Sequence, residues 1–230
     1  MMISGLQKLT LLDFPGKTAC TVFFYGCNFR CPFCHNASLV TEKDDGAGIS
    51  DEEFFRFLDT RRGLLDGVAV TGGEPTLQPE LYDFIYKIKE KDFSVKLDTN
   101  GTKPDVLKKL CGGGLVDYVA MDIKNSAEKY AETTGISLPD MQAVRESADF
   151  LMRGTVDYEF RTTLVKGFHT VQDIEEIGKW ISGAEKWFLQ AFKDSGNLIR
   201  EGLSGFSPDE YRAFLDTARL FVTNAQLRGI

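Results

Sequence analysis

Apolar residues follow two patterns along the chain, and together they predict alternating strands and helices. Six short and nearly continuous apolar runs, rich in β-branched and aromatic residues, have the character of strands buried on both faces. These predicted strands span residues 18–26, 67–73, 94–101, 117–124, 158–167 and 186–192. Stretches with apolar residues three and four positions apart predict helices at residues 50–62, 79–91, 103–110, 140–154, 171–182 and 207–225.

Each predicted strand is followed by a predicted helix, which is the order of repeated βα units. Such units form a parallel sheet with right-handed crossovers, either an open doubly wound sheet or a complete or partial barrel. In both architectures functional groups gather at the carboxyl ends of the strands. The segments at those ends are "CNFRCPFCHN" at 27–36, "TGGEP" at 71–75, "DTNG" at 98–101, "DIK" at 122–124 and Arg161. We therefore expect one site, in a single α/β domain that covers residues 1–230.

Composition and charge exclude several classes of function. The 27 Lys and Arg residues against 34 Asp and Glu give a net charge of −7, and such a surface repels nucleic acid unless basic residues gather in one patch. No apolar run approaches the roughly 20 residues of a membrane span, and the first residues lack the basic flank and cleavage site of a signal peptide. We expect a soluble, cytoplasmic protein that binds neither nucleic acid nor membranes.

Three of the five cysteines lie within one short loop. Because cytosolic cysteines stay reduced, Cys27, Cys31 and Cys34 are expected to bind metal or to react rather than to form disulfides. A structural zinc site needs four ligands, and both His35, directly after Cys34, and Cys20, inside a predicted strand, are poor candidates for the fourth. A cubane iron–sulfur cluster takes one thiolate on each of four irons, so three cysteines leave one iron open to a substrate or cofactor.

The loop resembles the signature of the radical S-adenosylmethionine (SAM) superfamily, in which three and then two residues separate the cysteines and an aromatic residue precedes the last one. Cys27, Cys31, Phe33 and Cys34 match this signature. "GCNFRCPFCHN", "TGGEPTLQ", "LDTNG" and "MDIK" are similar to motifs of the glycyl-radical-enzyme activases, and "LLDFPGK" at 11–17 is similar to the leader of the anaerobic ribonucleoside-triphosphate reductase activating proteins. The resemblance implies a partial (β/α)6 TIM-type barrel, with its core at 17–195, a leader at 1–16 and a C-terminal helix at 205–225.

The same resemblance implies an oxidoreductase that works without oxygen. A reduced [4Fe–4S] cluster would cleave SAM to methionine and a 5′-deoxyadenosyl radical, which would take a hydrogen atom from a glycine of a partner enzyme. The implied partner is an anaerobic (class III) ribonucleotide reductase, with pyruvate formate-lyase as the alternative, and the implied reductant is flavodoxin or ferredoxin. Two other functions stay open, namely a radical SAM enzyme that acts on a small molecule and a protein that carries electrons or clusters.

The resemblance also implies which residues surround the cofactors. Cys27, Cys31 and Cys34 would hold the cluster, and the residues in contact with SAM would be Phe33, Gly72, Gly73, Glu74, Asp98, Asn100, Lys124 and Arg161. No catalytic side chain is assigned, since the cluster and the cofactor carry the chemistry. Lys124 and Arg161 suit the cofactor carboxylate or the partner's peptide, and Arg161 suits an internal ion pair equally well.

The possible cation site is left open, and the remaining candidate side chains are mostly expected to have structural roles. A monovalent cation lies beside the cofactor in pyruvate formate-lyase activases, and the matching positions are Asp98, Thr99, Ala120 and Asp122. Ala120 offers only its backbone carbonyl, which leaves a cation near Asp98 and Asp122 open. Among the histidines, His35 suits either an acid or base role or packing over the cluster, and packing is favoured, whereas His169 is expected to face solvent. The remaining side chains predicted to be buried are Cys20, Cys111, Trp180 and Trp187.

Overall fold

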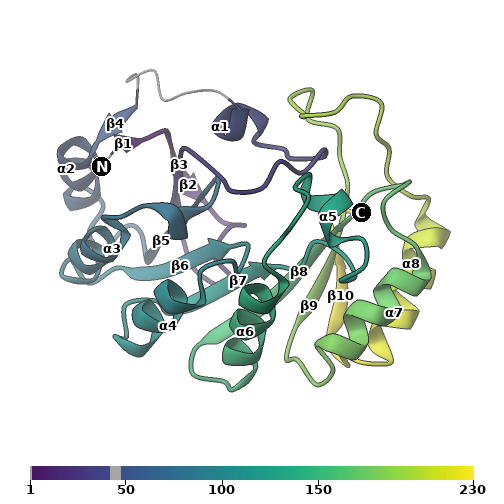
Figure 1. The fold of residues 1–230 in the computed structure, drawn as a ribbon. Helices are drawn as coiled ribbons and strands as arrows, with labels where there is room; N and C mark the ends of the chain where they lie inside the picture. Colours follow the sequence, from purple (N-terminus) through teal and green to yellow (C-terminus); the bar gives the residue numbers. More distant parts are fainter. Residues whose placement is uncertain (1, 42–47) are drawn as a thin grey trace.

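A curved sheet with helices along its convex side forms the body of the molecule in the computed structural model (Figure 1). The structure describes residues 2–41 and 48–230. The strands are β1 (Met2–Ile3), β2 (Gly5–Thr10), β3 (Ala19–Phe24), β4 (Ile49–Ser50), β5 (Gly67–Gly72), β6 (Ser94–Thr99), β7 (Tyr118–Asp122), β8 (Asp157–Leu164), β9 (Trp187–Ala191) and β10 (Ala225–Arg228). The helices are α1 (Ala37–Thr41), α2 (Asp51–Asp59), the 3-10 helix η1 (Pro75–Leu77), α3 (Leu81–Lys89), α4 (Pro104–Gly112), α5 (Tyr130–Thr134), α6 (Met141–Met152), α7 (Val171–Trp180) and α8 (Pro208–Arg219).

The strands of the main sheet lie side by side in the order β2-β3-β5-β6-β7-β8-β9-β10, which is their order along the chain. The strands from β3 to β10 run parallel, and β2 pairs with β3 in the antiparallel direction. A doubly wound sheet reverses its strand order at a switch point, and this sheet shows no such reversal. Because β2 and β10 each pair with one neighbour within the described residues, the sheet stays open. The predicted partial barrel is therefore confirmed.

The six predicted strands and six predicted helices are all present, with ends that differ by a few residues. The prediction missed β10, because the helix expected over 207–225 ends at Arg219 and a strand begins at Ala225. The sequence of β10, "AQLR", is too short and polar to show the apolar run that marks the other parallel strands. The leader strand β2 was also missed, because "GLQKLT" is mostly exposed or half-buried and lacks a continuous apolar run. The elements α1, α5, β1 and β4 were missed because they are too short to reveal a clear period.

Local sequence explains where the longer helices begin. The Ser50 hydroxyl accepts the N–H of Glu53, and the Glu53 carboxylate accepts the N–H of Ser50, which forms the capping box that starts α2. The same reciprocal pair starts α7 at Thr170 and α8 at Ser207.

No helix in the described part of the chain combines the length and the apolar content that a membrane crossing requires.

The two faces of the sheet carry different side chains, because neighbours along a strand point to opposite faces. Toward the helices the sheet buries apolar residues such as Leu97, Val119 and Phe160, each fully buried in the main core. Toward the concave side the strands β6, β7 and β8 present charged residues, among them Asp98 and Asp122. The core therefore lies between sheet and helices, and the inside of the arc stays polar.

Aromatic and charged side chains from the leader and from β7, β8 and β10 pack together on the concave face. Phe14 in the leader is 2% exposed and packs against Tyr118, with ring centroids 6.3 Å apart. Arg228 on β10 donates two hydrogen bonds to Glu159, at 2.8 and 3.1 Å, and Tyr118 donates to the same carboxylate at 2.9 Å. These contacts hold the last strand and the leader to the barrel, and they leave the carboxyl ends for a site.

Candidate active site

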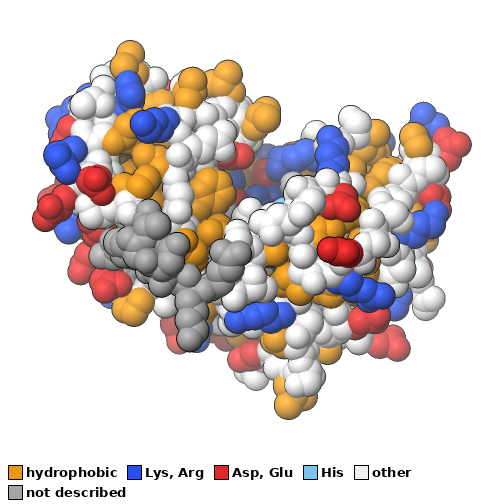
Figure 2. Space-filling view, turned by 90° about the horizontal axis from the view of Figure 1, so that it is seen from above, with side chains coloured by type: hydrophobic (Ala, Val, Ile, Leu, Met, Phe, Trp, Pro, Cys, Tyr) orange, Lys and Arg blue, Asp and Glu red, His pale blue; other side chains and the backbone are white. Residues whose placement is uncertain are grey.

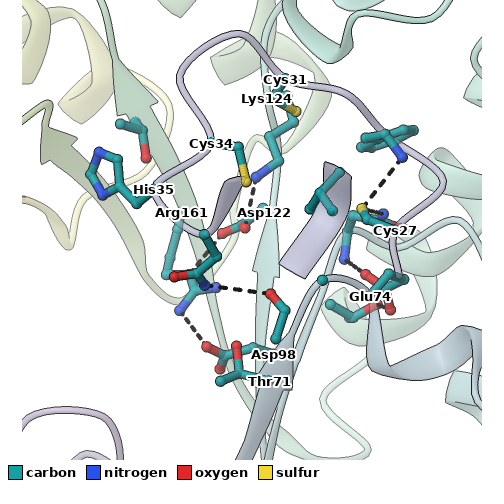
Figure 3. A pocket seen from close by; sticks show the side chains of 18 of the residues that line it. Cys27, Cys31, Cys34, His35, Thr71, Glu74, Asp98, Asp122, Lys124 and Arg161 are labelled. Carbon is teal, nitrogen blue, oxygen red and sulfur yellow. Dashed lines mark hydrogen bonds and ion pairs between the residues drawn. The ribbon is translucent and has the colours of Figure 1, made fainter. Parts of the chain in front are cut away.

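A pocket of about 410 Å³ occupies the concave face at the carboxyl ends of the strands (Figure 3). Seen from above, the molecule is hollowed near its centre, and Lys and Arg side chains gather along one wall of the hollow (Figure 2). Every residue that the sequence predicts for the site lines this pocket, namely Cys27, Cys31, Phe33, Cys34, Gly72, Gly73, Glu74, Asp98, Asn100, Lys124 and Arg161. These residues come from the cysteine loop, residues 27–36, and from the ends of strands β5 to β8.

The cysteine loop is attached to the end of β5 through two glycines. Gly73 donates its N–H to the carbonyl of Phe24 at 2.9 Å, and Glu74 donates its N–H to the carbonyl of Gly26 at 2.8 Å. A Cβ atom on Gly72 would lie 2.2 Å from the nitrogen of Phe24, and one on Gly73 would lie 2.0 Å from the oxygen of Gly26. Only glycine permits this approach of the two backbones, which sets the loop directly over the strand end.

The side chain of Glu74 fixes the ends of β5 and β6 relative to each other. Its carboxylate accepts hydrogen bonds from the backbone N–H and the hydroxyl of Thr76. It also accepts from the Thr99 hydroxyl at 2.8 Å and from the backbone N–H of Asn100 at 2.6 Å. Burial raises the pKa of Glu74, and these donors act against that rise. Glu74 is 1% exposed, so its carboxylate serves the geometry of the pocket wall.

The end of β6 holds the first cysteine of the loop. Asn28 donates to the Thr102 hydroxyl at 2.9 Å, and Asn100 donates to the side-chain oxygen of Asn28 at 2.9 Å. The side-chain nitrogen of Asn100 also lies 3.9 Å from the sulfur of Cys27, and the backbone N–H of Phe29 donates to that sulfur at 3.3 Å. Asn100 therefore positions the loop and contacts one of the thiols.

Helix α5, which the sequence prediction missed, supports the middle of the loop. The Phe29 and Tyr130 rings pack edge to face with centroids 6.2 Å apart, and the Arg30 N–H donates to the carbonyl of Thr134 at 2.8 Å. Gly135 then ends the helix with φ 67°, where a Cβ atom would lie 2.2 Å from the Arg30 carbonyl oxygen. The loop is thus supported by residues about a hundred positions further along the chain.

His169 is buried below the loop, with 3% of its surface exposed, so the prediction that it faces solvent is wrong. Its Nδ1 accepts the N–H of Val165 at 3.2 Å, and its Nε2 therefore donates to the carbonyl of Lys124 at 2.8 Å. The ring packs against Phe33, with centroids 6.2 Å apart, and burial lowers the pKa of His169. The local sequence gave no sign of this burial, because the partners belong to another strand end and to the cysteine loop.

Five charged side chains of alternating sign run across the concave face from β6 to β8. Figure 3 labels four of them, namely Asp98, Asp122, Lys124 and Arg161. Arg161 donates to Asp122 at 2.8 Å and to Asp98 at 3.0 Å, Lys124 donates to Asp122 at 2.9 Å, and Lys96 pairs with Asp98. Burial alone would raise the pKa of both aspartates, but Arg161 and the lysines outweigh it and hold both pKa values below the usual range. Burial alone would lower the pKa of Lys124, and Asp122 outweighs it and raises that pKa. Arg161 is therefore part of an internal ion pair, which the sequence had left open.

The three thiols of the loop form a donor set that fits a cluster better than a closed zinc site. Burial raises the pKa of Cys27 to about 11 and that of Cys31 to about 12, and coordination to iron would reverse this by favouring the thiolate. Within residues 2–41 and 48–230, no three His, Cys, Asp or Glu side chains stand ready to hold a single metal ion. A cubane needs one thiolate on each iron rather than several on one ion, and the buried rings of Phe29 and Phe33 shield this loop.

The pocket lining also includes residues to which the sequence analysis gave no individual role, among them Asp13, Thr71, Thr163 and Gln190. Asp13 accepts a hydrogen bond from the Thr21 hydroxyl at 2.6 Å, which draws the leader onto the concave face. Polar residues at the ends of apolar strands were a signal for the two threonines, whereas only the curvature of the sheet places Asp13 in the pocket.

His35 is exposed, and most of the other side chains expected in the core are buried. His35 packs against Phe192, with ring centroids 5.7 Å apart, and it lines the pocket. Partial burial, followed by the charge of Lys124, lowers the pKa of His35. Cys20, Cys111 and Trp187 are buried, as predicted, and Trp180 is half-buried.

Comparisons with known proteins connect this geometry to a family. The profile of the Radical SAM superfamily matches residues 21–181. A protein of Methanocaldococcus jannaschii, provisionally named a glycyl-radical enzyme activating enzyme, is 33% identical over 236 residues, which cover 100% of this chain and 96% of that protein. The pyruvate formate-lyase 1-activating enzyme of Escherichia coli K12 is 28% identical, over 88% of this chain and 93% of that enzyme. In fold, the chain is similar to Streptococcus suis SuiB bound to S-adenosylmethionine, with a TM-score of 0.69, 15% identity and coverage of 91% of this chain and 52% of that one.

Proposed function

This chain belongs to the radical SAM superfamily, and we propose that it is the activase of an anaerobic (class III) ribonucleotide reductase. Two relatives that are matched over more than nine-tenths of their length carry the names of glycyl-radical-enzyme and pyruvate formate-lyase activating enzymes, which supports an enzyme of that kind. One observation carries the proposal: three thiols from one loop line the same 410 Å³ pocket as the charged residues of β6, β7 and β8. A protein that only carries clusters needs no such pocket beside its thiols.

We propose that Cys27, Cys31 and Cys34 hold a [4Fe–4S] cluster and that SAM lies between it and the charged network. When bound, the reduced cluster and SAM together supply a carbon-centred radical by cleavage of the sulfonium. Lys124 has donors left beyond its bond to Asp122, and it lines the pocket, so it suits the cofactor carboxylate. The other proposed contacts are Phe33, Gly72, Gly73, Glu74, Asp98, Asn100 and Arg161.

The charged network bears on whether a monovalent cation accompanies the cofactor. The two carboxylates that match a cation site, Asp98 and Asp122, are both bonded to Arg161, and each has a lysine as its second partner. A metal cation would have to displace these groups or share their carboxylates. We therefore propose that the guanidinium of Arg161 takes the place of the cation in this enzyme.

A second candidate partner is pyruvate formate-lyase, because its activating enzyme in Escherichia coli matches this chain over 93% of that enzyme's length. The leader motif "LLDFPGK" supports the reductase over this candidate. We further propose that the whole chain acts as a single domain and that flavodoxin or ferredoxin reduces the cluster.

The experiment that tests the proposal is anaerobic. The protein is reconstituted with iron and sulfide, reduced with dithionite and mixed with SAM, and 5′-deoxyadenosine is followed by chromatography. The anaerobic ribonucleotide reductase of the same organism is then added, and its glycyl radical is followed by electron paramagnetic resonance. We expect the nucleoside in both reactions and a radical signal that depends on the reductase.

Each alternative has its own outcome in this experiment. A radical on pyruvate formate-lyase, with none on the reductase, would replace the proposed partner by the second candidate. Nucleoside formation that needs a small molecule and yields no protein radical would point to a small-molecule substrate. Tight binding of zinc without any cleavage of SAM would remove the enzyme function altogether.

A further inference from the structure

The leader carries three apolar side chains on the surface within four residues. Leu9 is 57% exposed, Leu11 is 71% exposed and Leu12 is 90% exposed. Single exposed leucines are common on protein surfaces, but a group this dense places a continuous apolar patch in water. We refer to Leu9, Leu11 and Leu12 as the leucine patch.

The leucine patch is held in place by buried neighbours on both sides. The Thr10 side chain is 5% exposed, and its hydroxyl accepts the N–H groups of Leu12 and Asp13 at 3.2 Å. Two residues further on, Phe14 is buried among residues at the amino ends of the strands. A turn fixed at both ends holds these leucines outward, although nothing in the described part of the chain covers them.

The position of the patch connects it to the pocket. Asp13 follows Leu12 directly, lines the pocket, and is bonded to Thr21 on the concave face. The preceding strand β2 is the edge of the sheet, and the barrel is open between β2 and β10. Thr10 pairs with Ala19 at the start of β3, so the leucines lie at the leader margin of this open side, within four residues of Asp13 in the pocket lining. A protein that covers the open side to reach the pocket would therefore be close to the leucine patch.

The charges around the patch restrict what can cover it. Lys8 and Lys17 flank the leucines, and neither forms an ion pair with another described residue, while the Lys17 Nζ lies 5.8 Å from the centroid of the Phe14 ring. The rest of the molecule is acidic, with a net charge of −7 overall. An apolar centre with basic margins fits a protein surface with an apolar centre and acidic margins, which is the usual anatomy of a transient interface.

We propose that the leucine patch is the docking site for the glycyl-radical enzyme, outside the pocket that receives its glycine. This inference rests on the proposed function. It separates two tasks on the same partner, because the pocket selects the backbone around the glycine while the leader binds a folded surface nearby. Recognition of a whole enzyme, rather than of any glycine-containing peptide, then comes from the leader.

The test compares two double variants against two substrates. Leu11→Ser/Leu12→Ser removes the two most exposed leucines, and Tyr86→Ser/Leu220→Ser removes two exposed apolar side chains from the helical side, where Tyr86 is 48% and Leu220 is 78% exposed. The substrates are the anaerobic ribonucleotide reductase of the same organism and a short synthetic peptide that carries its glycine loop. The KM for each substrate, the dissociation constant of the complex with the reductase, and SAM cleavage without any partner are measured.

We expect the leader variant to raise the KM and the dissociation constant for the reductase by tenfold or more, each tenfold step being about 1.4 kcal/mol. The KM for the peptide and the SAM cleavage without partner should stay within about twofold of the parent, which is under 0.5 kcal/mol. The helical-side variant should match the parent in every measurement. This set of results supports the docking site.

Three other results overturn the inference, and each is recognisable. An unchanged KM for the reductase shows that the patch makes no contact. Equal losses with reductase, peptide and SAM alone show that the variant damaged the pocket. A parent protein that elutes as a dimer, with a leader variant that elutes as a monomer, assigns the patch to a second copy of this chain. Failure of the proposed function is distinct from all of these, because the parent itself would then leave the reductase without a radical.

Discussion

The two faces of one sheet show how this protein divides stability from chemistry. On β6, Lys96, Leu97 and Asp98 follow one another along the chain, and the middle residue faces the helices while the other two face the concave side. Leu97 is fully buried in the main apolar core, and its two neighbours form an ion pair with each other. Adjacent residues of a strand therefore belong to different environments, one apolar and one charged.

The difference follows from what each face has to contain. In a closed TIM-type barrel the inside is filled with layers of branched apolar side chains. Here the sheet stays open between β2 and β10, and the inside carries Asp98, Asp122 and Arg161 around a pocket. Apolar burial against the helices supplies the stability, which frees the concave face for polar groups.

The sharpest contrast between the faces comes from the same substitution on each side. Cys31→Ala removes a proposed cluster ligand, and we expect the formation of 5′-deoxyadenosine to fall to the level of a protein-free control. Cys20→Ala removes a fully buried thiol from the helical side of β3 and should cost about 1 kcal/mol of unfolding free energy while SAM cleavage persists. Chromatography of the nucleoside and denaturant unfolding of both variants measure the two effects. Cleavage by Cys31→Ala at the parental rate would contradict the cluster assignment.

Removing apolar volume from the helical side should destabilise the fold without changing the chemistry. Leu97→Ala leaves a cavity in the main core, and we expect a loss of about 2 to 5 kcal/mol of unfolding free energy. The rate of SAM cleavage per folded molecule should stay near that of the parent. Leu97→Met, which keeps the volume, serves as the control and should cost less than about 1.5 kcal/mol. A large loss of cleavage in folded Leu97→Ala would show that the two faces are not independent.

Breaking the charged network should weaken cofactor binding as well as the fold. Arg161→Met leaves Asp98 and Asp122 without their shared partner, and we expect the dissociation constant of SAM to rise by about tenfold to a hundredfold, or roughly 1.4 to 2.8 kcal/mol. Equilibrium dialysis of the reconstituted protein under argon measures this constant. Arg228→Met, which breaks a pair with Glu159 outside the pocket lining, is the matched control and should leave SAM binding unchanged. Equal effects of the two variants would mean that Arg161 acts through the fold alone.

The lowered pKa values of Asp98 and Asp122 predict how stability depends on pH. Because both pKa values are below the usual aspartate value of about 3.9, their contribution is present above that pH and is lost as the pH falls below it toward the folded-state values. Asp122→Asn should reduce the acid slope of the unfolding free energy by up to about 1.4 kcal/mol per pH unit. Denaturant unfolding of the metal-free protein between pH 6 and roughly pH 3 tests this. Glu74 has a raised pKa and contributes the opposite slope, so the variant is compared with its parent at every pH.

The smallest expected effect concerns monovalent cations. If Arg161 replaces the cation, exchange of potassium and sodium for choline should change the rate of SAM cleavage by less than about twofold, which is under 0.5 kcal/mol. The variant Arg161→Met should instead become faster when potassium is added, since its aspartates are then free to bind it. Strong potassium dependence in the parent would show that a cation binds beside the guanidinium.

Periodicity was sufficient for most of the fold and insufficient for its edges. The parallel strands from β3 to β9 and the helices between them are long enough to show their apolar pattern, so they were predicted. The edge strand β10 was missed because "AQLR" lacks the apolar run of the other parallel strands, and helix α5 was missed because its five residues span little more than one helical turn. Both missed elements matter for the site, since α5 supports the cysteine loop and β10 marks one margin of the open side.

The sequence by itself determined the alternation of strands and helices, the strand ends where polar residues gather, and the thiols that are available to a cluster. These features are local, because they depend on spacing along a single segment. Only the tertiary structure decided that His169 lies buried below the cysteine loop, that Arg161 joins Asp98 and Asp122, and that the leader brings Asp13 to the pocket. Each of these contacts joins segments through the curvature of the sheet, and the curvature depends on the packing of all the strands and helices together.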